Sequence, residues 1–144
     1  MPKVCEIPLY RPTSEEVIGI LSESRRIAVV GLSPKEERDS NEVARYMMEA
    51  GYEIIPVNPM CEEILGLKSY PTLSEVPGEI DIVDIFRRLD AVPGIVEEAV
   101  EKGAKTVWMQ ENIVHNQAAK RAKDAGLKVV MNKCIMVEHR NWKS

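Results

Sequence analysis

The chain has 144 residues, of which 44% are hydrophobic and 29% are charged, and its formal net charge is −4. This balance is typical of a soluble globular protein with room for one core, and it argues against broad nucleic-acid binding, which needs a basic face. No apolar run approaches the length of about 20 residues that crosses a bilayer, and the N-terminus lacks the apolar centre of a signal peptide. We therefore expect a cytoplasmic location, no membrane contact and one domain, 1–144, in which 1–12 form an N-terminal arm.

Three cysteines, Cys5, Cys61 and Cys134, stand far apart, and the two histidines are isolated. The sequence has no C-x-x-C spacing, so neither a disulfide framework nor a metal site is predicted.

Short β-branched runs alternate with segments of helical periodicity along the chain. Strands are expected at 27–30, 53–57, 80–86, 105–109 and 127–131, with a short strand near 65–67. Helices are expected from Thr13 or Ser14, from a cap at Ser40, and over 93–102, 115–125 and 135–142, with a helical turn near 73–76. Such alternation predicts right-handed βαβ units. The expected fold class is therefore α/β, with a doubly wound, mainly parallel sheet of five to six strands and helices on both faces.

The segment from Arg26 to Asn41 joins a buried strand, a glycine and a helix start, an arrangement that favours anions. After Gly31 the loop offers the hydroxyl of Ser33 and the cations of Lys35 and Arg38. We expect this turn to hold the phosphates of a nucleotide-containing ligand. The alternative is a solvated loop in which acidic and basic side chains neutralise one another, and the loop alone does not separate the two.

The turn differs from the common nucleotide-binding motifs. Gly31 is its only glycine, so the G-x-G-x-x-G fingerprint of dinucleotide-binding proteins is missing. The second strand ends in Val57-Asn58-Pro59, without a carboxylate for a ribose hydroxyl, and no G-K-[ST] of a Walker A motif occurs. These departures count against NAD and against a P-loop nucleotide.

A second group of residues is expected opposite the glycine turn. In a doubly wound sheet, ligands bind outside the carboxyl ends of the strands, where the strand order reverses. That rule places Phe86, Arg87 and Arg88 beside the turn, and their ring and two guanidiniums suit a phosphorylated ligand. The alternative is a structural ion pair, either Arg87 with Asp84 or Arg88 with Asp90. Asp84 lies inside the expected strand and needs a partner if it is buried.

Five motifs in this order, GLS, PVNP, IDIVDIFRR, WMQ and NKCIMVEH, resemble the stand-alone CoA-binding proteins. These proteins are similar to the N-terminal CoA-binding domain of the succinyl-CoA synthetase alpha subunit, and the resemblance covers nearly all of residues 13–142. It implies a Rossmann-like domain that binds coenzyme A.

The resemblance also implies which residues contact each part of the ligand. The pyrophosphate would lie near Gly31, Leu32 and Ser33, with Ser40 and Asn41 at the helix start, and the 3′-phosphate would meet Lys35 or Arg38. The adenine and ribose would be bordered by Val57, Asn58 and Pro59. The opposite wall would consist of Phe86, Arg87, Arg88 and the loop to Val92, and the pantetheine arm would lie along Met109, Gln110 and Asn112.

Two segments depart from the family pattern. Relatives often have Q-x-G where this chain has Gln110-Glu111-Asn112, although Asn tolerates the left-handed conformation nearly as glycine does. Relatives often have Asp-Arg-Cys where this chain has Asn132-Lys133-Cys134, and Lys133 is counted among the expected contacts.

We interpret the chain as a module that binds coenzyme A or an acyl-CoA in a carrier, sensor or regulatory role, with a protein partner or a homo-oligomer compatible with it. It is not expected to be an enzyme, because no catalytic arrangement emerges and His115 and His139 are expected at the surface or as caps. The alternative is an NAD(P)-dependent oxidoreductase, or another nucleotide-dependent enzyme, with a degenerate turn. Two alternatives are open for Cys134: it forms a mixed disulfide with the CoA thiol, or it is a buried and inert cysteine.

Overall fold

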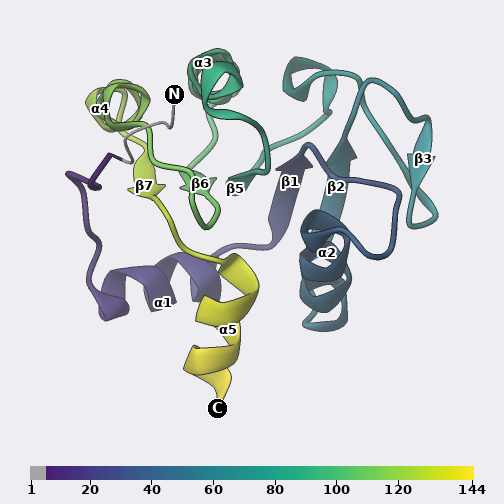
Figure 1. The fold of residues 1–144 in the computed structure, drawn as a ribbon, viewed down its shortest axis with the longest axis horizontal. Coiled ribbons are helices and arrows are strands. Elements are labelled where there is room, and N and C mark those ends of the chain that lie inside the picture. The colour runs from purple at the N-terminus through teal and green to yellow at the C-terminus, as the bar shows by residue number, and fades with distance from the viewer. Residues whose placement is uncertain (1–5) are drawn as a thin grey trace, which may run out of the picture.

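Five parallel strands form the central sheet of the part that the structure describes, residues 6–144 of a computed structural model (Figure 1). The strand order is β2-β1-β5-β6-β7, and every neighbouring pair runs parallel. The strands span Arg26–Val30 (β1), Glu53–Val57 (β2), Ile82–Ile85 (β5), Thr106–Met109 (β6) and Lys128–Val130 (β7). The predicted fold class, a Rossmann-like doubly wound α/β sheet, is confirmed.

Helices cover both faces of this sheet, and Figure 1 shows the three layers. One face carries α1 (Ser14–Glu23), α2 (Asp39–Glu49) and α5 (Ile135–Lys143). The other carries α3 (Val92–Lys102) and α4 (Asn116–Asp124), with the short 3-10 helices η1 (Leu73–Glu75) and η2 (Leu89–Ala91) in the connections. No helix within residues 6–144 combines the length and the apolar character needed to cross a membrane.

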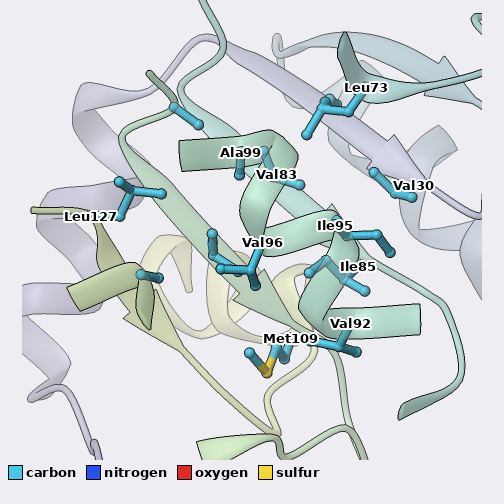
Figure 2. Close-up of a cluster of buried hydrophobic side chains, with 14 of the residues drawn as sticks. Val30, Leu73, Val83, Ile85, Val92, Ile95, Val96, Ala99, Met109 and Leu127 are labelled. Atoms are coloured by element: carbon cyan, nitrogen blue, oxygen red, sulfur yellow. The ribbon is translucent and has the colours of Figure 1, made fainter. Parts of the chain in front are cut away.

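Each face of the sheet has its own hydrophobic core. Val83 and Ile85 of β5 pack against Val96 and its neighbours on α3 (Figure 2). On the opposite face, Trp108 is fully buried beneath α1, α2 and α5, and its indole N–H donates to the Lys133 carbonyl at 2.8 Å. Because the strands are covered on both sides, they read as continuous apolar runs in the sequence.

Two local expectations are corrected. The segment near 65–67 is a strand only from Leu67 onward, because Leu65 and Gly66 have φ of 58° and 74° and form the turn between β3 (Glu63–Ile64) and β4 (Leu67–Lys68). Positive φ at both central residues is the geometry of a tight hairpin. A leucine in that conformation is rare, which is why the sequence did not indicate a turn.

His139 is not a surface or capping residue, because it is only 6% exposed. Its ring stands edge-on to Tyr46, Tyr52 and Trp142, and Nδ1 lies 2.9 Å from the Tyr46 hydroxyl. Burial, with a smaller contribution from Lys143, lowers the pKa of His139. The residue therefore joins α5 to α2 as a neutral member of an aromatic cluster.

The described part of the N-terminal arm, residues 6–12, is held against the start of α4. The Asn116 side chain accepts from the N–H of Leu9 at 2.8 Å and donates to the Ile7 carbonyl at 2.9 Å. The Asn116 N–H in turn donates to the Glu6 carboxylate at 3.0 Å. Cys5 and the rest of the expected arm, 1–5, lie outside the described residues.

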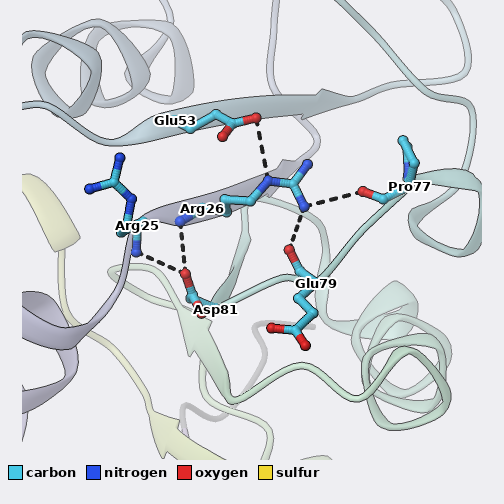
Figure 3. A network of polar contacts seen from close by, with 6 residues as sticks. All are labelled: Arg25, Arg26, Glu53, Pro77, Glu79 and Asp81. Carbon is cyan, nitrogen blue, oxygen red and sulfur yellow. Dashed lines mark hydrogen bonds and ion pairs between the residues drawn. The ribbon is translucent and has the colours of Figure 1, made fainter.

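A polar network fixes the amino ends of the strands (Figure 3). The Asp81 carboxylate accepts from the N–H groups of Arg25 and Arg26 at 2.8 and 2.9 Å, and the Arg26 guanidinium contacts Glu53 at 3.3 Å and donates to the carbonyls of Pro77 and Glu79. Burial alone would raise the pKa of Asp81, but the hydrogen bonds from the two backbone N–H groups and from Lys105 outweigh it, so the pKa is lowered.

We expect Asp81→Asn to lower the free energy of unfolding at pH 7 by about 1–2 kcal/mol, because hydrogen bonds to a charged acceptor are lost. A lowered carboxyl pKa stabilises the fold above the unfolded pKa of about 4, and this contribution disappears as pH falls. The difference between variant and wild type should therefore shrink between pH 5 and pH 2 in urea titrations. Asp124→Asn, which removes an exposed pair with Lys120, is the control and should cost less than about 0.5 kcal/mol. A pH-independent effect of Asp81→Asn would contradict the assignment.

Candidate functional site

The loops after four strands are joined side by side at the carboxyl edge of the sheet. In each case, a residue one to three positions beyond one strand donates its N–H to the last residue of a neighbouring strand. The bonds run from Gly31 to Val57 at 3.0 Å, from Phe86 to Val30 at 2.9 Å, from Gln110 to Ile85 at 3.4 Å and from Lys133 to Met109 at 3.4 Å. The strand order reverses between β1 and β5, so the loops after these two strands form the switch point.

Gly31 allows the two switch-point loops to approach closely. Its φ is +92°, a conformation that side chains disfavour. A Cβ atom at this position would lie 2.8 Å from Cδ of Arg87 and closer still to the carbonyl oxygen of Phe86. The expected proximity of Phe86 and Arg87 to the glycine turn is therefore observed.

The loop after β1 is shaped by side chains of α2. Ser40 accepts from the Ser33 N–H at 2.9 Å, and the Asn41 amide donates to the Ser33 carbonyl at 2.8 Å. Ser40 is thus not the helix cap that the sequence suggested, because Arg38 occupies that position and Ser40 lies one residue inside the helix. The Ser33 hydroxyl accepts from the Lys35 N–H at 3.1 Å, which leaves its own proton available to donate.

The cations of this loop are exposed. Within residues 6–144, neither Lys35 nor Arg38 forms an ion pair with Glu36 or Glu37, so the mutual neutralisation considered for this loop is not observed there. The side chain of Leu32 is buried in the core, so only its backbone faces the loop.

The two arginines after β5 differ. Arg87 is exposed and its side chain lies over Gly31. Arg88 lies 3.6 Å from Asp90, and both side chains are more than 70% exposed, so this pair contributes little to stability. The pair of Arg88 with Asp90 that was weighed as an alternative is present, whereas no pair of Arg87 with Asp84 occurs in the described chain.

Asn58 connects the loop after β2 to the glycine turn. Its amide donates to the Leu32 carbonyl at 2.9 Å, and its side-chain oxygen accepts from the Met60 N–H at 2.8 Å. Val57 is buried, whereas Pro59 is exposed and Met60 is 87% exposed. Met60 was not among the expected site residues, because exposure of an apolar side chain cannot be read from sequence.

The residues expected along a pantetheine arm lie at different depths. Met109 is fully buried, and Gln110, 4% exposed, accepts from the Ile135 N–H at 3.2 Å. Asn112 is exposed and adopts φ of 70°, so the asparagine does take the left-handed conformation, and its N–H donates to Asn132 at 2.7 Å.

Two other expected contacts have limited access. Val92 is 0% exposed as the first residue of α3, so its side chain belongs to the core. Lys133 is half-buried, and its carbonyl accepts from the Trp108 indole.

A cavity of about 310 Å³ lies beside these loops, between the ends of β5 and β6 and the helices α2 and α5. Of the residues expected from sequence as ligand contacts, Phe86 and Gln110 line this cavity. It is also lined by Asp39, Glu42, Val43, Glu111, Ile113, Cys134, Met136 and Val137. Most of the additional residues belong to α2 and α5. These helices are distant in the sequence and meet at this edge only in the folded chain. Cys134 is half-buried at the wall of the cavity.

Asp84 is the one strand carboxyl in the core, 1% exposed and located between Val29 and Trp108 on the sheet. Its Oδ1 has no hydrogen-bond partner among the described residues. Burial raises the pKa of Asp84 well above its usual range. Burial therefore favours the neutral acid over the carboxylate at this position.

His115 caps α4, because its ring nitrogen accepts from the Ala118 N–H at 3.1 Å. Within residues 6–144, no three His, Cys, Asp or Glu side chains are grouped as metal ligands would be.

A doubly wound sheet with a glycine turn and exposed cations at its switch point defines a Rossmann-like domain. A family model described as a CoA binding domain matches residues 25–140, and the chain belongs to this family.

Relatives of two kinds are found. The protein YneT of Bacillus subtilis (strain 168) is 45% identical over 131 residues, which cover 91% of this chain and 97% of YneT. The solved structure of a hypothetical protein from Pyrococcus horikoshii OT3 superposes with a TM-score of 0.91 at 42% identity and covers both chains in full. The alpha subunit of ADP-forming acetate–CoA ligase II from Pyrococcus furiosus is 37% identical over 84 residues, 58% of this chain but only 18% of that subunit.

We expect Gly31→Ala to be more damaging than Gly126→Ala. The two glycines have φ of 92° and 94°, so each alanine should cost about 1–2 kcal/mol in the left-handed conformation. A Cβ at Gly126 meets nothing within 4 Å, whereas at Gly31 it collides with the loop after β5. Urea unfolding should therefore show an additional loss of at least about 1 kcal/mol for Gly31→Ala. Equal losses would mean that the second loop moves aside freely.

Proposed function

We propose that this protein binds coenzyme A or an acyl-CoA at the carboxyl edge of its sheet, across the loops after β1, β2 and β5. The observation that carries the proposal is the close approach of Gly31 to Phe86 and Arg87, because it brings backbone and a guanidinium together where phosphates would lie. Membership of the CoA-binding domain family supports the same ligand.

The phosphates would be met by four groups of the switch point. The Ser33 hydroxyl retains a donor, and Arg87, Lys35 and Arg38 are exposed without an ion-pair partner among the described residues. Asn41 and Ser40 would act indirectly, since their side chains already hold the loop backbone. We assign the pyrophosphate to Ser33 and Arg87, and the 3′-phosphate to Lys35 or Arg38.

The adenine and ribose would lie on the β2 side, against Asn58, Pro59 and the exposed Met60. The pantetheine arm would cross Phe86 and enter the cavity beyond it, where Gln110 and the apolar side chains of α2 and α5 form the lining. Asp39, Glu42 and Glu111 also line this cavity. Their carboxylates would repel a negatively charged acyl group, so acetyl-CoA should bind better than malonyl-CoA.

We further propose that the chain is a non-catalytic module. His115 and His139 have structural partners, one as a helix cap and one in the aromatic cluster. The cationic loops provide binding and orientation of an anionic ligand, which suits a carrier, sensor or regulator.

Calorimetry with the full chain tests the ligand. We expect CoA and acetyl-CoA to bind, dephospho-CoA to bind about tenfold more weakly because one charge-assisted contact is lost, and malonyl-CoA to bind more weakly than acetyl-CoA. NAD and NADP serve as controls. Absence of CoA binding at roughly millimolar ligand, or tighter binding of NAD, would overturn the proposal.

Substitutions test the residues. Arg87→Ala should weaken CoA binding by about 1.5–3 kcal/mol, and Ser33→Ala by about 1 kcal/mol, because a charged and a neutral hydrogen bond are lost. Arg121→Ala is the matched control, since this exposed arginine pairs with Glu97 on the α3–α4 side. If Arg87→Ala and Ser33→Ala bind CoA as tightly as Arg121→Ala does, the site lies elsewhere.

A further inference from the structure

A second hollow, of about 510 Å³, lies away from the proposed CoA site. It is enclosed by the arm, α1, the end of α4 and the outer edge of β7, beside which the arm descends in Figure 1. It reaches β7 through Leu127, Lys128 and Val129, at the amino end of the strand. The CoA site is at the carboxyl ends, so the two sites do not share residues.

This second hollow is a groove that exists before any ligand binds, because the arm that forms its outer wall is held in place. Asn116 holds the arm by hydrogen bonds to Glu6, Ile7 and Leu9. A neighbouring hollow of about 460 Å³ shares Ile20, Leu127 and Lys128 with it, so the depression continues around the amino end of β7. An elongated ligand matches this shape better than a compact one.

Backbone groups at the edge of β7 inside the groove have no strand partner in the described chain, and Val129 at this edge is 4% exposed. Within residues 6–144, β7 has only β6 as a neighbour, and the Lys128 N–H points towards it, donating to Lys105 at 2.9 Å. Successive residues of a strand direct their N–H and C=O groups to opposite sides. The N–H and C=O of Val129 therefore point to the outer edge, where an added strand would pair.

Exposed apolar side chains and an uncovered glycine lie near this edge of β7. Ile7 and Leu9 are 67% and 72% exposed, and Leu9 lines the groove. The floor includes Gly19, in the middle of α1, where glycine costs about 1 kcal/mol relative to alanine. A Cβ there would meet nothing within 4 Å, so the fold does not require glycine, but a larger side chain would fill the groove.

The charge of the groove is positive. Arg11, Lys123 and Lys128 line it, and none of them forms an ion pair within residues 6–144. Residues 1–5, Met-Pro-Lys-Val-Cys, contain no carboxylate that could neutralise them. The one acidic residue of the lining, Glu16, accepts from the Thr13 N–H at 2.7 Å in the cap of α1. That bond and, to a smaller extent, the nearby Lys123 and Lys128 lower the pKa of Glu16, and the three cations of the lining outnumber this one acid. A second copy of the chain, paired edge to edge, would bring like charges together.

We propose that this groove binds an extended acidic segment of a partner protein, which adds as a strand to the free edge of β7. Its carboxylates meet Arg11, Lys123 and Lys128, and its alternate apolar side chains cover Leu9 and the open surface at Gly19. Occupation of this groove is independent of the CoA site.

The test uses the full chain and two capped peptides of about eight residues, one alternating Glu and Val and the other alternating Lys and Val. In amide NMR spectra, the acidic peptide should shift Gly19, Lys128 and Val129 and reach saturation, and the basic peptide should not. Gly19→Trp should weaken binding by about tenfold or more, because the indole occupies the groove. Gly94→Trp, at a helical glycine that is also open, is the control and should bind as wild type does.

A second variant keeps the test decisive if Gly19→Trp unfolds. Lys123→Glu combined with Lys128→Glu should reverse the preference, so that the basic peptide binds and the acidic one does not. The proposal is overturned if neither peptide binds wild type, if both bind equally, or if the acidic peptide shifts only residues outside the groove. Concentration-dependent shifts of Val129 without peptide would identify a second copy as the occupant and would equally overturn it.

Discussion

The contact between the end of β1 and the end of β5 is the constraint on which the carboxyl edge depends. Gly31 lies against the Phe86 carbonyl and the Arg87 side chain, so the two loops meet without a side chain between them. The hydrogen bonds of the sheet continue past the strands on both sides of this contact, as far as Val57 and Lys133. A wider separation at Gly31 would displace the whole row, and with it the wall of the adjoining cavity.

The two ends of the sheet are built differently. At the amino ends, the Asp81 carboxylate accepts from backbone N–H groups at the start of β1, and the Arg26 guanidinium pairs with Glu53 of β2. These contacts tie the amino ends of β1, β2 and β5 together. At the carboxyl ends, Lys35, Arg38 and Arg87 remain exposed. Around β1, β2 and β5, structural charge and available charge thus lie at opposite edges, and the loops proposed to contact a ligand need not also hold these strands together.

Sequence reasoning recovered the parts of the molecule that local patterns determine. The 53–57 strand has the predicted bounds, and the switch-point rule placed Phe86 and Arg87 beside Gly31. It failed where distant segments decide the outcome. The Ser40 hydroxyl is taken by the loop rather than by the helix end, and the helices that line the cavity meet only in the folded chain. The burial of His139 could not be predicted from local sequence, because its aromatic partners come from α2, the segment before β2 and the last helix.

Asp84 has a consequence for how the chain folds. In an unfolded chain at neutral pH this carboxyl is ionised, since its pKa is then near 4, but in the core burial raises the pKa and favours the neutral acid. Folding therefore favours the protonated form of Asp84, and this contribution to stability is greatest below the unfolded pKa and declines as pH rises. Asp81, three residues earlier, acts in the opposite direction. Asp84, within β5, and Asp81, just before that strand, thus couple folding to proton binding in opposite senses, so in the pH range where they titrate the measured heat of folding will depend on the buffer.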